Sequence, residues 1–141
     1  MIHSLLEKVV ASVPVAVGSS AVTMTIDSLG YDFASVAVLR ASNASTVFAS
    51  VLKVEESEDG STYTNVVGLL GGTDFTIPVV TDTSVASIVK LDVDTRAKKR
   101  YLKVTATPAV SVNVVISARL SRGENSPSTA SEAGCVGWIK G

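Results

Sequence analysis

The sequence predicts an all-β protein, on three observations. Apolar residues make up 46% of the 141 residues but aromatic residues only 5%, and the apolar share is rich in valine, which is β-branched and favours strands. In several stretches, apolar residues recur at every second position, which is the period of a strand. Turn residues separate these stretches at short intervals. About eight strands with this spacing predict a two-layer sandwich or a barrel.

The N-terminal residues 1–19 are expected to form an arm outside this domain. Residues 2–10 have the pattern of one or two helical turns, with Leu5 and Leu6 on one side, but a helix this short is marginal alone because nucleation is costly. The arm is therefore expected to become ordered only against a partner. Pro14 and the lack of a small-residue cleavage site argue against a secretory signal.

The strands are expected within a domain spanning residues 20–120. A stretch at 33–39 is apolar on both faces except for Ser35, which indicates a central strand, and Pro78 marks an edge or irregular strand because proline donates no ladder bond. Glu58, Asp59 and Gly60 supply the turn of a hairpin. The expected strands cover residues 21–26, 33–39, 46–54, 62–70, 75–80, 86–93, 101–107 and 110–120.

The last part of the chain, residues 121–141, is expected to be a flexible linker followed by a tail. Residues 121–134 are rich in Ser, Gly, Pro and Glu and bury too little apolar surface to become ordered alone. Val136, Trp138 and Ile139 are apolar again and include the only tryptophan. This tail either folds back onto its own sheet, as most large aromatic residues do, or inserts into a neighbouring subunit as an interface anchor.

The overall charge and the single cysteine exclude several classes of partner. The formal net charge is −1, so no basic field gathers nucleic acid or anionic lipid. No apolar run reaches the roughly 18 to 20 residues that span a bilayer, and we expect a soluble protein. Cys135 has no second cysteine to pair with, which fits a protein made in a reducing cytoplasm.

Catalytic and metal chemistry is not expected. The only histidine is His3, and together with Cys135 it cannot build a zinc site. No nucleophile with a base and an orienting group is apparent, so we expect no enzyme activity, cofactor or metal.

Two charged loops are the candidate polar contacts. The acidic one is either a solvated turn that protects a strand end or, as an alternative, a calcium site; the basic one is a solvated turn or an ionic contact to an acidic partner. We call them the acidic hairpin, residues 55–59, and the basic turn, residues 96–100. Their charged members are Glu55, Glu56, Glu58 and Asp59, and Arg96, Lys98, Lys99 and Arg100.

Three segments resemble a known group of proteins. Residues 54–64, VEESEDGSTYT, and residues 99–108, KRYLKVTATP, are similar to two strand segments in small all-β proteins encoded among the head genes of tailed bacteriophages. Tyr31-Asp32-Phe33 precedes them in the same order, and the resemblance covers roughly residues 20–120. Several of these proteins are capsid decoration or cement proteins.

This resemblance implies an eight-stranded jelly roll, which the long final strand also favours, with an immunoglobulin-like sandwich as the alternative. It implies a structural virion protein, made in the bacterial cytoplasm, that sits on the outside of the capsid as a homotrimer and bridges subunits of the major capsid protein. The two charged loops would make polar contacts. The straps would be Leu5, Leu6, Val136, Trp138 and Ile139. The alternative function is a carbohydrate- or receptor-binding module of a phage tail or fibre.

Overall fold

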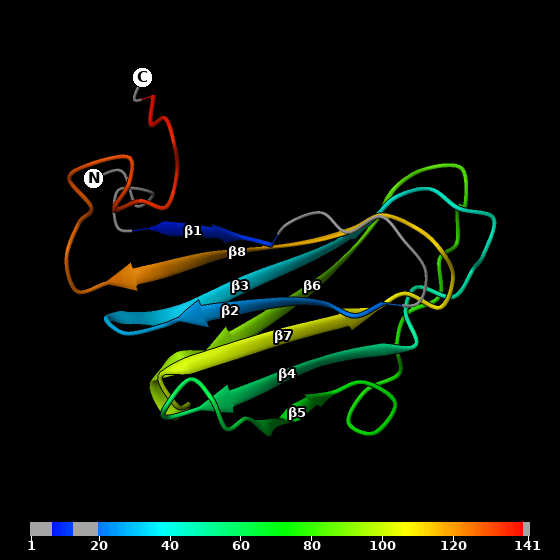
Figure 1. Ribbon diagram of the computed structural model, residues 1–141, viewed down its shortest axis with the longest axis horizontal. Coiled ribbons are helices and arrows are strands. Elements are labelled where there is room, and N and C mark those ends of the chain that lie inside the picture. Colours follow the sequence, from blue (N-terminus) through cyan, green and yellow to red (C-terminus); the bar gives the residue numbers. More distant parts are fainter. Residues whose placement is uncertain (1–6, 13–19, 140–141) are drawn as a thin grey trace.

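The computed structural model describes residues 7–12 and 20–139, which form two antiparallel four-stranded sheets packed face to face (Figure 1). The first sheet has the strand order β1-β8-β3-β6 and the second β2-β7-β4-β5. The strands are β1 (Lys8–Ala11), β2 (Val22–Asp27), β3 (Tyr31–Arg40), β4 (Val51–Ser57), β5 (Thr64–Leu70), β6 (Ser87–Asp94), β7 (Tyr101–Thr107) and β8 (Val114–Gly123), with one short 3-10 turn, η2 (Thr95–Ala97), after β6.

The connectivity is that of a jelly roll. Successive strands alternate between the two sheets, except for the hairpin from β4 to β5, so that each sheet interleaves strands from both halves of the chain. An immunoglobulin-like sandwich would instead place the first two strands in one sheet. The predicted all-β sandwich is thus confirmed, and the strand order selects the jelly roll between the two alternatives.

The core lies between the sheets and is built by the alternation that predicted the strands. One set of side chains on each strand points inward and is buried, and the aliphatic side chains with no exposed surface come from both sheets. Phe48 is the one aromatic residue of this core cluster among the described residues. The core residues with 0% exposure are Ile26, Ala34, Val36, Val38, Leu52, Val54, Leu102, Val104, Ile116 and Leu120.

Two of the predicted elements differ in the structure. The helical turns predicted within residues 2–10 are wrong for the described part of that range, because Lys8–Ala11 is a strand that pairs with β8. The strand predicted at 75–80 is also wrong, since Phe75 and Val79 make only isolated bridges. Lys8–Ala11 forms a strand because the edge of β8 is available for pairing. No strand forms at 75–80 because Pro78 has no N–H to donate to a ladder.

The segment after Leu120 also differs from the predicted flexible linker. Strand β8 continues to Gly123, and a hydrogen-bonded turn follows in which Thr129 and Glu132 cap each other: Glu132 N–H donates to Thr129 Oγ1 (3.2 Å) and Thr129 N–H to Glu132 Oε2 (3.3 Å). This turn contacts the first strand, because Val9 N–H donates to Ala133 O (2.9 Å). This segment has the composition of a linker, but a capping box and a hydrogen bond to the edge strand β1 give it an ordered conformation.

Candidate functional site

Both charged loops and the C-terminal segment lie at one end of the sandwich, the left end in Figure 1. The register explains this placement: Asp27, Ser57 and Tyr101 are aligned across the second sheet, so the turn at 28–30, the loop at 58–63 and the connection at 95–100 emerge together. We call this end, with residues 124–139, the terminal face.

The acidic hairpin is held by one of its own carboxylates. Asp59 accepts hydrogen bonds from the N–H groups of Thr62 (2.9 Å) and Ser61 (2.9 Å) and from the hydroxyl of Ser57 (2.8 Å). These bonds hold the pKa of Asp59 far below its ordinary value. Gly60 has a φ of 72° and lies against the Tyr101 ring, with the position a Cβ would take 3.5 Å from it. Asp59 therefore shapes the turn instead of being a free charge.

Glu55 is bound between two lysines on the outer face of the second sheet. Its carboxylate lies 3.0 Å from Lys53 Nζ and 3.2 Å from Lys103 Nζ, with only 12% of the side chain exposed. Burial alone would raise the pKa of Glu55, but the bonds from both lysines outweigh it, and the pKa lies below its ordinary value. The Lys103 ammonium also lies over the Tyr63 ring, 4.2 Å from its centroid. This cluster fixes the strand end from which the acidic hairpin starts.

The basic turn is likewise paired within the chain. Arg96 donates from Nε to Asp94 Oδ1 (2.9 Å), and this bond, with that from the Arg96 N–H, lowers the pKa of Asp94 to about 2. Arg100 donates from Nε (2.9 Å) and Nη2 (2.7 Å) to the Asp27 carboxylate, a bidentate pair. Its carbonyl accepts from the Ser28 hydroxyl at 2.7 Å. The basic turn and the β2–β3 turn thus hold each other in place.

The structure brings the two predicted loops into direct contact. Lys99 N–H donates to Glu56 Oε2 at 3.0 Å, which joins the basic turn to the acidic hairpin. Within residues 7–12 and 20–139, the side chains of Glu58, Lys98 and Lys99 have no charged partner, and they are the groups available to an external one. No cluster of three potential metal ligands occurs in that part of the chain.

The predicted straps are only partly covered by the structure. Leu5 and Leu6 lie outside the described residues. The side chains of Val136 and Ile139 are fully exposed, whereas Trp138 is half-buried. The half-buried Cys135 donates its thiol to Ala130 O at 3.3 Å. The terminal face therefore presents exposed apolar side chains on the side of β1, and fixed charged loops at the ends of β4, β6 and β7 (Figure 1).

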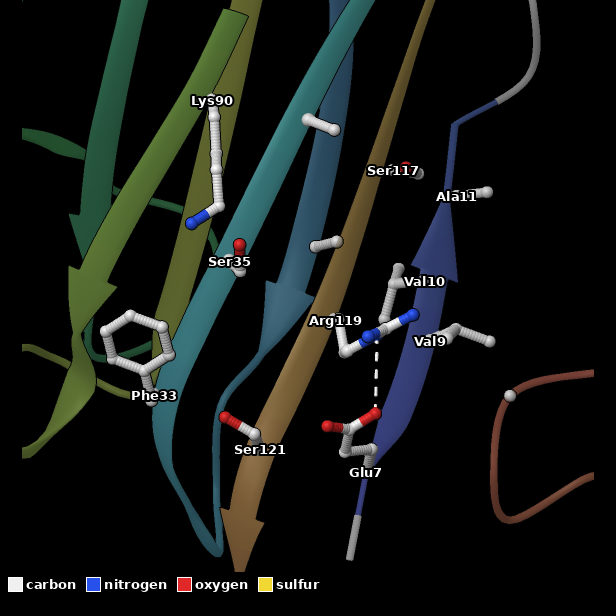
Figure 2. A pocket seen from close by; sticks show the side chains of 13 residues that line it. Glu7, Val9, Val10, Ala11, Phe33, Ser35, Lys90, Ser117, Arg119 and Ser121 are labelled. Atoms are coloured by element: carbon white, nitrogen blue, oxygen red, sulfur yellow. Dashed lines mark ion pairs between the residues drawn. The ribbon is translucent and has the colours of Figure 1, made fainter. Parts of the chain in front are cut away.

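A shallow groove of about 590 Å³ on the outer face of the first sheet was not foreseen from the sequence (Figure 2). Its floor consists of small side chains from neighbouring strands, Ser35 and Ala37 on β3 and Ser117 on β8, and an ion pair of 3.3 Å between Arg119 and Glu7 crosses one side. The available signal is the pair of small residues, Ser35 and Ala37, at alternate positions of the otherwise apolar β3. Other lining residues include Val9, Phe33, Lys90, Ser121 and Gly134.

No family model and no curated protein significantly matches the sequence. A solved structure from work on Bacillus endospore appendages, described there as a novel family of disulfide-linked pili, is similar over 82% of this chain and 89% of its own chain, with 15% identity and a TM-score of 0.37. A similarity of this size carries no information about function. No helix in the described ranges is long and apolar enough to cross a bilayer.

Proposed function

We propose that this protein is a structural component of a tailed-phage virion that binds the outside of the capsid through its terminal face and stabilises the shell by bridging subunits of the major capsid protein. The observation that carries the proposal is the full exposure of the Val136 and Ile139 side chains at the end of the sandwich that also holds both charged loops. Exposed apolar anchors beside a polar rim are the usual composition of a protein interface.

The two charged loops of the terminal face are suited to binding because the chain itself holds them in place. Hydrogen bonds within the protein fix the loops that carry Asp59, Glu56 and Arg100. These loops therefore lose little conformational entropy when a partner binds. Residues 54–64 and 99–108, which carry the resemblance to decoration proteins, include the acidic hairpin and the last two residues of the basic turn. We propose that the protein lies on the outer surface of the capsid. The trimeric state that the resemblance implies is a separate prediction, which sedimentation of the isolated protein tests.

The alternative, a carbohydrate- or receptor-binding module, has less support. A sugar site ordinarily presents exposed aromatic faces, but Tyr31, Tyr63 and Tyr101 are each half-buried. The Tyr63 ring is covered by Lys103, and the Arg100 guanidinium lies over the Tyr101 ring at 4.8 Å. Binding to a glycan array by the intact protein, without binding to capsids, would favour this alternative.

The test is co-sedimentation of the purified full chain with capsids assembled from the major capsid protein encoded beside it. We expect saturable binding at a fixed ratio per capsomer and a higher melting temperature of the shell. The double variant Val136→Ser, Ile139→Ser should weaken binding at least about tenfold, the scale of losing interface anchors.

The matched control is Val67→Ser, since Val67 is 90% exposed on β5, outside the terminal face. This variant should bind as the unmodified protein does. Absence of binding to both immature and expanded shells would overturn the proposal. If the control and the double variant lost capsid affinity equally, the terminal face would not be the binding surface.

A further inference from the structure

Strand β6 forms one edge of the first sheet and leaves its outer side open. It pairs with β3 over Ser87–Asp94 on one side only, and in Figure 2 the strand that carries Lys90 borders the sheet on the side away from β1. Its alternate side chains, Ile88, Lys90, Asp92 and Asp94, are exposed. In the part of the chain that the structure describes, no backbone group bonds to this edge.

The hydrogen-bonding parity of β6 follows from that of β3. Ala41 N–H donates to Asn113 O (2.9 Å) in the same register as the β3–β8 pairs, so odd-numbered residues of β3 face β8. Along a strand inside an antiparallel sheet, the backbone groups of successive residues bond alternately to the strand on one side and to the strand on the other. The backbone groups of the even-numbered residues of β3 therefore bond to β6, where Val36 pairs with Leu91. The β6 backbone groups that point to the open edge are those of Ile88, Lys90, Asp92 and Asp94.

Two other sheet edges are closed by the chain itself. The Val9 N–H on the outer side of β1 is taken by Ala133 O. On β5, the Asp74 carboxylate accepts from the N–H groups of Gly68 (2.9 Å) and Leu70 (3.0 Å). Side-chain and segment caps of this kind prevent edge-to-edge association. Strand β6 carries no such cap among the described residues.

We propose that β6 pairs with β6 of a second copy of this chain, in antiparallel orientation about a two-fold axis through Leu91, to join two sheets into one. The parity permits only registers in which even-numbered residues face each other. With the axis at Leu91, Lys90 of each copy lies opposite Asp92 of the other. About eight main-chain bonds would then form, two for each of four bonded residue pairs.

Charge complementarity selects this register over its neighbours. A shift by two residues in one direction places Lys90 opposite its own copy, and the same shift in the other direction places Asp92 opposite its own copy; both juxtapose like charges. In the proposed register, the existing pair between Lys90 Nζ and Asp92 Oδ2, 2.7 Å apart, becomes a square of alternating charges. Of these three registers, only the proposed one places no charged residue opposite its own copy.

The inner side of β6 fits the same pairing. Leu91 is 7% exposed and Val89 is half-buried at the margin of the core. In the proposed register, the two copies of Leu91 form a non-bonded pair, the type in which side chains approach most closely. Among the described residues the outer edge of β2 also has no partner, but β2 has no such self-complementarity, because Thr23 and Thr25 are neutral and Asp27 is bound to Arg100.

Analytical ultracentrifugation of the full chain tests the proposal. We expect a dimer of twice the chain mass of 14.5 kDa. Lys90→Glu and Asp92→Lys should each raise the dissociation constant about 10- to 100-fold, since each opposes like charges twice. Mixing the two variants should restore a heterodimer, and the double variant Lys90→Asp, Asp92→Lys should restore the homodimer. Both side chains are exposed, at 63% and 45%, so the fold should tolerate these changes.

The matched control is Thr25→Glu, a charge placed on the open β2 edge, which should leave the dimer intact. A monomer, a trimer as the resemblance predicts, or an open polymer of the unmodified protein would overturn the proposal. So would a dimer that Thr25→Glu dissociates and Lys90→Glu does not, or two variants that fail to associate when mixed. None of these outcomes depends on capsid binding.

Discussion

Replacing Gly134 by alanine should detach the C-terminal turn from the first strand. Gly134 has a φ of 78°, and an added Cβ would lie 2.0 Å from Val9 O, a backbone atom that cannot rotate away. An alanine in left-handed geometry costs about 1 to 2 kcal/mol. Relieving the clash also breaks the bond from Val9 N–H to Ala133 O (2.9 Å), which is worth about 0.5 to 1.5 kcal/mol. The sum is roughly 1.5 to 3.5 kcal/mol.

The loss of global stability is limited by the docking energy of the turn, because the sandwich remains folded when the turn leaves. Amide hydrogen exchange is therefore the more direct assay: the Val9 amide should exchange about 10- to 100-fold faster, since each 1.4 kcal/mol is a factor of ten. The control is Gly137→Ala, where no atom lies within 4 Å of the added Cβ and φ is not positive. Unchanged protection of Val9 in the Gly134 variant would refute the reasoning.

Three further predictions concern stability and association. Arg100 lowers the pKa of Asp27. The Asp27 carboxylate therefore stabilises the fold above about pH 4, and this contribution is lost as the pH falls through the folded-state pKa. The Asp27→Asn variant should have a lower melting temperature than the unmodified protein at pH 7, and its melting temperature should fall less on acidification. Asp74→Ala frees two amides on the β5 edge and should increase aggregation, measured by light scattering, whereas an unchanged signal would show that the carboxylate does not protect this edge. Leu102 has 0% exposure, so Leu102→Ala should lower the free energy of unfolding, measured in urea, by about 2 to 5 kcal/mol. Val67 is 90% exposed, and Val67→Ala should change this free energy by no more than about 0.5 kcal/mol.

Strands in which apolar and polar residues alternate could be predicted from the sequence, and so could β3, whose apolar run predicted its central place in a sheet. In β2 and β7, and in β8 from Ile116 to Ser121, apolar and polar positions alternate, and the apolar set lies in the core of the structure. Strand β1 could not be predicted this way, because Lys8–Ala11 is too short to show a period and becomes a strand only through its pairing with β8, more than a hundred residues away. Local pattern carries no information about such a partner.

The candidate site was predictable in its parts and not in its assembly. The acidic hairpin and the basic turn are visible as charge clusters, but the bond from Lys99 N–H to Glu56 depends on the order of strands in the second sheet. The spacing of Thr129 and Glu132 is that of a capping box and was a readable signal of order. The composition of the surrounding residues, rich in Ser and Gly, conceals it.

The position of β8 has a consequence for how the chain folds during synthesis. This strand lies between β1 and β3, so the first sheet has an empty place in its middle until residues 114–123 have been made. Until then β3 exposes an unpaired edge, and the many contacts of high sequence separation make this final insertion slow. A chain that ends after β7 would therefore lack a complete first sheet, and its open strand edges would be available for aggregation.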